Sequence, residues 1–153
     1  MGADAQGWGA FLRHFELEPH ELDRLALFLL AHAFLDRWLI HAIALKEFKD
    51  RVEGGVRIRD SDEEIDRLIS ENAKGEFGKH MGQAKGAGVL PAPDRVICEE
   101  VNRARNRFLH WEPGRFKVPT YQGQAVTTEA GLLQCLSDID KVIVTLQGRI
   151  DAA

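Results

Sequence analysis

The sequence predicts an all-α fold: a four- to five-helix up-and-down bundle with a short β-hairpin or irregular insertion before the last helix. Apolar residues recur with helical period over most of the chain, and Pro or Gly stands where these stretches begin and end. A short β-favouring stretch around Gly123 is the exception. With 153 residues, 44% of them hydrophobic, the chain is expected to form one domain, residues 1–153, with a substantial core.

The first half of the chain predicts three helices. Residues 8–17 carry apolar side chains at amphipathic spacing, and Pro19 then suits the first turn of a long helix over 19–52, which Gly54 and Gly55 end. A short extended piece is expected at 56–58. Ser61, with an acidic residue three positions later, has the form of a capping box and predicts a third helix to about residue 73.

The second half predicts two more helices, separated by irregular segments. In the glycine-rich stretch 75–93, Gly75, Gly78, Gly82 and Gly86 could mark a closely packed helix face, but a mobile loop is expected, because each Gly costs a helix about 1 kcal/mol. Pro93 and Asp94 open the next helix, which the sequence 112–114 (Glu-Pro-Gly) closes. Residues 116–126 predict a small hairpin or ordered loop, after which Thr127 or Thr128 caps a strongly apolar last helix.

Composition bounds the function. The net charge of −4 excludes a general nucleic-acid binder, so any site for a polyanion must be local. Residues 95–117 provide such a place, with a net charge of +3. Its cations are Arg95, Arg103, Arg105, Arg107, Arg115 and Lys117, and its anions are Glu99, Glu100 and Glu112. The ordinary alternative is a solvated helix face with ion pairs.

Several features indicate a cytoplasmic protein. Cys98 and Cys135 lie far apart in predicted helices, which favours two buried thiols in a reducing compartment over a disulfide. The N-terminus lacks the charged and apolar regions of a signal peptide. The longest apolar run, 25–45, is interrupted by four polar residues, which favours a bundle helix over a membrane span.

The stretch Arg105-Asn106-Arg107-Phe108-Leu109-His110 carries the chemistry. Arg offers a planar, permanently charged fork for phosphate oxygens, and His carries a proton that moves near neutral pH. Asn106 stands four residues before His110, so it faces the imidazole and can orient it. Arg105 and His110 lie about 140° apart around a helix and roughly 7.5 Å along it. Their convergence on one phosphate therefore requires that the helix end near His110, that a second copy contribute, or both.

This motif, near the end of a helix and late in a small helical chain, resembles that of the HEPN domains. Many members of that family are metal-independent RNA endonucleases of toxin–antitoxin and defence systems. The resemblance implies catalytic roles for Arg105, Asn106 and His110, a homodimer whose cleft joins two motifs, and a cognate antitoxin. No cofactor is expected. The neighbouring side chains expected to bind RNA are Arg103, Arg107, Trp111, Arg115 and Lys117.

Two other hypotheses remain open. One is a non-catalytic HEPN-like module that binds RNA or a protein. The other is a metal-dependent enzyme using His32 and Asp36, which stand at i, i+4, with His14 or His80 as further ligands. Asp36, or Arg37 on the opposite face of the same helix, could instead hold His110 or Arg105 in position. The simpler alternative is a buried, hydrogen-bonded polar pair. Trp111 and Tyr121 could stack on a base.

Overall fold

A computed structural model describes residues 17–109 and 117–151. In these residues the chain forms five helices and one two-stranded hairpin, which confirms the predicted all-α bundle. The helices are α3 (Pro19–Glu53), α4 (Ser61–Asn72), α5 (Phe77–Gly86), α6 (Ala92–Leu109) and α7 (Glu129–Asp151). The hairpin strands are β1 (Thr120–Tyr121) and β2 (Gln124–Ala125). The predicted helix over 8–17 falls almost entirely outside the described residues.

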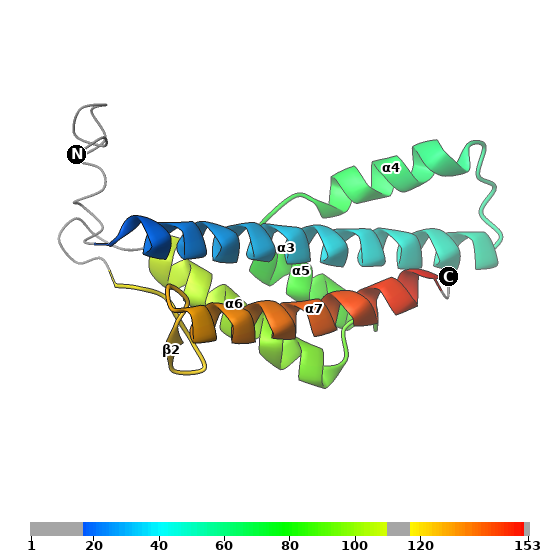
Figure 1. The fold of residues 1–153 in the computed structure, drawn as a ribbon. Helices are drawn as coiled ribbons and strands as arrows, with labels where there is room; N and C mark the ends of the chain where they lie inside the picture. Colours follow the sequence, from blue (N-terminus) through cyan, green and yellow to red (C-terminus); the bar gives the residue numbers. More distant parts are fainter. Residues whose placement is uncertain (1–16, 110–116, 152–153) are drawn as a thin grey trace, which may run out of the picture.

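The 35-residue helix α3 is the axis of the bundle, and every other described helix packs on it. Helix α7 runs beside it in the same direction, and α4 turns back along its C-terminal half (Figure 1). Helices α5 and α6 pack on α3 and on each other, and α6 also contacts α7. In Figure 1, α4 lies along the C-terminal half of α3, and the C-terminal end of α6 lies near its N-terminal half.

The core is continuous across α3, α5, α6 and α7. Phe28, Leu35 and Leu39 of α3 are fully buried, as are Val142 and Leu146 of α7. The two cysteines join this core as free buried thiols, as predicted, and burial raises the pKa of each to about 12. At neutral pH both therefore stay protonated and behave as small apolar side chains.

The glycine-rich stretch is not a loop: the prediction there was wrong. Residues 77–86 form α5, because Phe77, His80 and Ala84 recur at helical spacing and are buried against the rest of the bundle. The glycines of α5 are exposed. Tertiary burial of one face thus outweighs the low helix propensity of the other.

One local prediction is also corrected. Asp60, not Ser61, caps α4: its carboxylate accepts hydrogen bonds from the backbone N–H groups of Asp62 and Glu63. Asp and Ser are both good caps, and the chain begins the helix one residue earlier. Residues 56–58, predicted as a short extended piece, lie outside the helices and strands.

The hairpin confirms the prediction for 116–126 where it is described. Its turn places Gln122 and Gly123 at positive φ (49° and 77°), the geometry of the tight turns that match strand twist. Thr128 caps α7, accepting from the N–H of Gly131 and donating to the carbonyl oxygen of Ala125 at 2.7 Å. A Cβ atom on Gly131 would lie 2.1 Å from that same oxygen, so only glycine lets the hairpin approach α7 this closely.

Helix α3 is long and apolar enough to cross a membrane by length and composition alone. The core helix of a soluble bundle passes the same test. In this structure α3 buries one face, including Phe28, Leu35 and Leu39, against the other helices.

Candidate functional site

Helix α6 carries the motif and ends at its last described residue, Leu109. Arg105 and Asn106 lie in its C-terminal part and are both partly exposed. His110, Trp111 and Arg115 lie outside the described residues, so their predicted roles stay predictions. Lys117 is exposed on the segment that leads into the hairpin.

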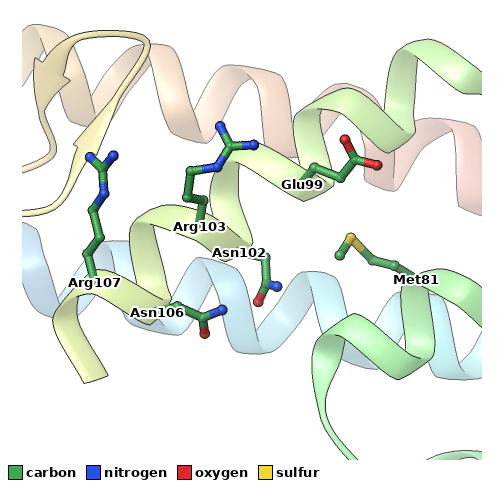
Figure 2. A pocket seen from close by; sticks show the side chains of 6 residues that line it. All are labelled: Met81, Glu99, Asn102, Arg103, Asn106 and Arg107. Atoms are coloured by element: carbon green, nitrogen blue, oxygen red, sulfur yellow. The ribbon is translucent and has the colours of Figure 1, made fainter. Parts of the chain in front are cut away.

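An open hollow of about 560 Å³ runs along α6, with Met81 of α5 at one end. The α6 side chains that line it are Glu99, Asn102, Arg103, Asn106 and Arg107. In Figure 2, Arg103 and Arg107 extend from α6 on one side, and Asn102 and Asn106 point together to the other. The structure thus brings three predicted site residues, Arg103, Asn106 and Arg107, into one surface.

A second hollow of about 170 Å³ lies between α6 and the hairpin and shares Arg103 and Arg107 with the first. Arg107 donates a hydrogen bond from Nη1 to Oγ1 of Thr120, at 3.1 Å. The two arginines therefore border both hollows, at a place where the sugar–phosphate backbone of a nucleic acid could contact them.

Arg105 acts electrostatically on a histidine of another helix, His32 of α3. Burial, and then the positive charge of Arg105, lower the pKa of His32 to about 4, against the weaker opposing effects of a hydrogen bond with the Asn102 side chain and of the Asp36 charge. His32 is only 3% exposed, and with this pKa its ring is uncharged at neutral pH. Arg105 forms no ion pair with any residue in 17–109 or 117–151, so in these residues it takes no part in the ion-paired helix face that was the alternative, and Glu99 and Glu100 do not pair with it.

His32 is itself incompletely satisfied. Its Nε2 atom is buried and has no hydrogen-bond partner among the residues described. Its ring packs at 4.4 Å from that of Phe77, centroid to centroid. A buried polar atom without a hydrogen-bond partner lowers the stability of the fold. Native proteins contain few such atoms, and one that is retained can mark a functional site.

Asp36 supports a different histidine from the one expected. Its Oδ1 lies 2.6 Å from Nδ1 of His80, whose Nε2 is 3.2 Å from the carbonyl oxygen of Lys74. This hydrogen bond holds α5 against α3, and none of its groups lines the hollow on α6. Arg37 is exposed on the other side of α3, where its charge adds to burial in lowering the pKa of His41.

The metal hypothesis gains no support. The part of the chain that the structure describes holds no group of three or more His, Cys, Asp and Glu side chains placed to bind a metal ion. His80 does lie beside Asp36, as that hypothesis required, but as a hydrogen-bonded pair. His14 lies outside the described residues.

Sequence reasoning missed Asn102 and the electrostatic effect of Arg105 on His32. Asn102 stands three and four residues before Arg105 and Asn106, so its spacing places it on their side of the helix. The effect on His32 joins residues 73 positions apart, and no local pattern could have revealed it.

Tyr121 takes a structural place. It is 1% exposed, and its hydroxyl donates to Oδ2 of Asp138 at 2.7 Å. Base stacking by Tyr121 is thereby excluded in this conformation.

No family model, curated protein or solved structure matches this chain.

Proposed function

We propose that this protein is a metal-independent RNA endonuclease of the HEPN toxin or defence type. The observation that carries the proposal is Arg105, a motif arginine without an ion-pair partner among the described residues, which precedes Asn106 of the arginine-lined hollow and acts on a neutral His32. A permanent charge that no described residue compensates is suited to an anionic ligand.

The chemistry needs three contributions. The ribose 2′-hydroxyl attacks the adjacent phosphorus, the bond to the leaving 5′-oxygen breaks, and a 2′,3′-cyclic phosphate forms. A base takes the hydroxyl proton, an acid protonates the leaving oxygen, and a cation stabilises the charge on the phosphorane. In the proposal Arg105 holds the non-bridging oxygens, His110 moves the proton and Asn106 orients them.

The surrounding cations would hold the RNA backbone. Arg103 and Arg107 line both hollows on α6, and Lys117 lies at the entrance to the hairpin. Trp111 and Arg115 complete this set in the sequence. In the proposal two copies of the chain contribute one His110 each, one as base and one as acid, and a cognate antitoxin restrains the enzyme in the cytoplasm.

A second candidate is a non-catalytic module of the same type that binds RNA or a protein. Glu99 favours it, since this carboxylate lines the same hollow and would repel phosphate. Binding that survives His110→Ala but falls after Arg105→Ala, without any cleavage, would identify this function.

The test is cleavage of a mixed RNA pool by the purified protein with excess chelator. We expect cleavage that the chelator leaves unchanged and products ending in 2′,3′-cyclic phosphate. Arg105→Ala and His110→Ala should each remove it, whereas Arg149→Ala and His20→Ala, exposed controls on α7 and α3, should not. Full activity in the Arg105→Ala, His110→Ala double variant would disprove the proposal.

A further inference from the structure

The N-terminal half of α3 carries an apolar outer face that none of the described elements covers. Leu27, Leu30 and Phe34 are 50%, 67% and 58% exposed and fall on one side of the helix. Along the C-terminal half, α4 packs on α3 (Figure 1), and His41, Ala44 and Phe48 on the same side are buried or half-buried. The largest exposed apolar cluster on this side therefore lies in the half that α4 does not cover.

The residues on this face mirror one another around Leu30. Three positions before it stands Leu27 and three after it Ala33; four before stands Ala26 and four after Phe34. Each mirrored pair thus joins one large and one small side chain. The next pair, seven residues out, joins an acid and a base, Asp23 and Arg37, and every one of these residues is exposed.

We propose that a second copy of this chain covers this face, with the two α3 helices antiparallel and a two-fold axis at Leu30. In such a pair, a residue n positions before Leu30 faces the residue n positions after Leu30 in the other copy. Phe34 then packs over Ala26 of the second copy, and Leu27 over its Ala33. Asp23 meets Arg37 twice, once on each side of the axis.

The antiparallel direction follows from the same residues. A parallel pair would place Asp23 on Asp23, Arg37 on Arg37, and Phe34 on Phe34. Like charges directly opposed disfavour that arrangement, and the small residues would face one another across gaps. The seven-residue spacing of Asp23, Leu30 and Arg37 is the repeat of helices that pack side by side as a coiled coil.

The interface is independent of the proposed function. Leu30 and His32 lie about 160° apart around α3, so the pairing face is turned away from His32 and Arg105. Pairing through Leu30 leaves the hollow on α6 open. A contact between motif helices across a shared cleft, as the endonuclease proposal has it, would be a separate interface.

Charge exchange tests the pairing through native mass, measured by light scattering over a concentration series. Asp23→Arg gives a chain with two arginines at the paired positions, and Arg37→Asp gives one with two aspartates. We expect each variant alone to raise the dissociation constant of this contact about tenfold or more. An equimolar mixture of the two should restore association to the wild-type level, because each arginine then meets an aspartate.

Two further variants address the apolar centre. Leu30→Glu should halve the native mass, whereas Leu133→Glu, at a 57% exposed position on α7, should leave it unchanged. Leu30→Cys should form a disulfide-linked dimer on mild oxidation, since two copies meet at this position. A wild-type protein that stays monomeric, a mass unaffected by Leu30→Glu, or a mixture no more associated than its components would overturn the proposal, and would assign the face to another segment or another protein.

Discussion

Two buried polar clusters of this molecule are built in opposite ways. At the hairpin, Asp138 of α7 accepts hydrogen bonds from Tyr121, Gln134 and Lys141. These bonds lower its pKa against the opposing effect of burial. Between α3, α5 and α6, by contrast, His32 keeps an unpartnered buried nitrogen beside the charge of Arg105.

The difference separates a structural cluster from a functional candidate. A carboxylate with several donors fixes the hairpin on α7 and leaves nothing over for a ligand. A cation without an acidic partner among the described residues contributes little to folding and retains its charge for an anion. The predictions below test whether this division holds.

The largest effect is expected on catalysis. Arg105→Ala should lower RNA cleavage about a hundredfold or more, because the phosphorane loses its positive partner. The matched change in the other cluster is Lys141→Ala, which removes a donor to Asp138 and should leave the cleavage rate unchanged. Initial cleavage rates of the two variants on one RNA test this prediction. Equal losses of activity would show that the two clusters do not differ in function.

The next effect concerns acid stability. Above pH 6.5, His32 is neutral in both the folded and the unfolded chain and adds no pH dependence. As the pH falls towards 4, the unfolded chain takes up the proton and the folded one does not, because its His32 has a pKa of about 4. His32 should therefore reduce the free energy of unfolding by about 3 kcal/mol across this range, with no further loss below it.

Urea unfolding at pH 7 and pH 4 measures this change. His32→Leu should remove that part of the slope, and the difference between wild type and variant isolates it from the other titrating groups. His20→Leu, at an exposed position in the first turn of α3, is the control. A variant with the wild-type slope would show that His32 is not the group responsible.

A smaller effect is expected at the Asp138 cluster beside the hairpin. Asp138→Ala should lower the free energy of unfolding by about 2 kcal/mol, because the buried Tyr121 hydroxyl loses its acceptor. Tyr121→Phe should cost only about 1 kcal/mol, since Asp138 keeps Gln134 and Lys141 as donors. Thermal unfolding of both variants checks the order, and the reverse order would contradict it.

The smallest effect is expected at Arg107, which lines the hollow on α6 and also bonds to the hairpin. Its bond to Thr120 is exposed, so Arg107→Ala should change the free energy of unfolding by less than about 0.5 kcal/mol. RNA binding should weaken several-fold, with a shallower dependence on salt, because one phosphate contact is lost. Thr120→Val, which removes the same bond and keeps the charge, should leave RNA binding unchanged.

Most of the fold could be predicted from sequence because its signals are local. Pro19 and Gly54 mark the two ends of α3, and Thr128 caps α7 with its side-chain hydroxyl, as the structure confirms. Helix α5 could not be predicted, since Phe77, His80 and Ala84 become decisive only when α3 and α6 are there to bury them. For the same reason, the partner of Asp36 was found only in three dimensions.

The candidate site, too, could be predicted where local spacing determines it and not where distant packing does. The spacing of Arg103, Asn106 and Arg107 places them on one side of α6, and they do line one hollow. The pKa of His32 depends on its burial and on the charge of Arg105, a residue of another helix. The electrostatics of the site thus depends on long-range packing that no motif encodes.

The packing of α3 against α7 has a consequence for how the protein is made. These two helices stand at opposite ends of the described chain, yet they share its most extensive contact. A growing chain therefore carries part of the core face of α3 uncovered until α7 has been synthesised. At roughly 5–20 residues per second, that interval lasts several seconds. During translation the nascent protein is thus open to chaperones and proteases, and a chain truncated before α7 has no means of closing its core.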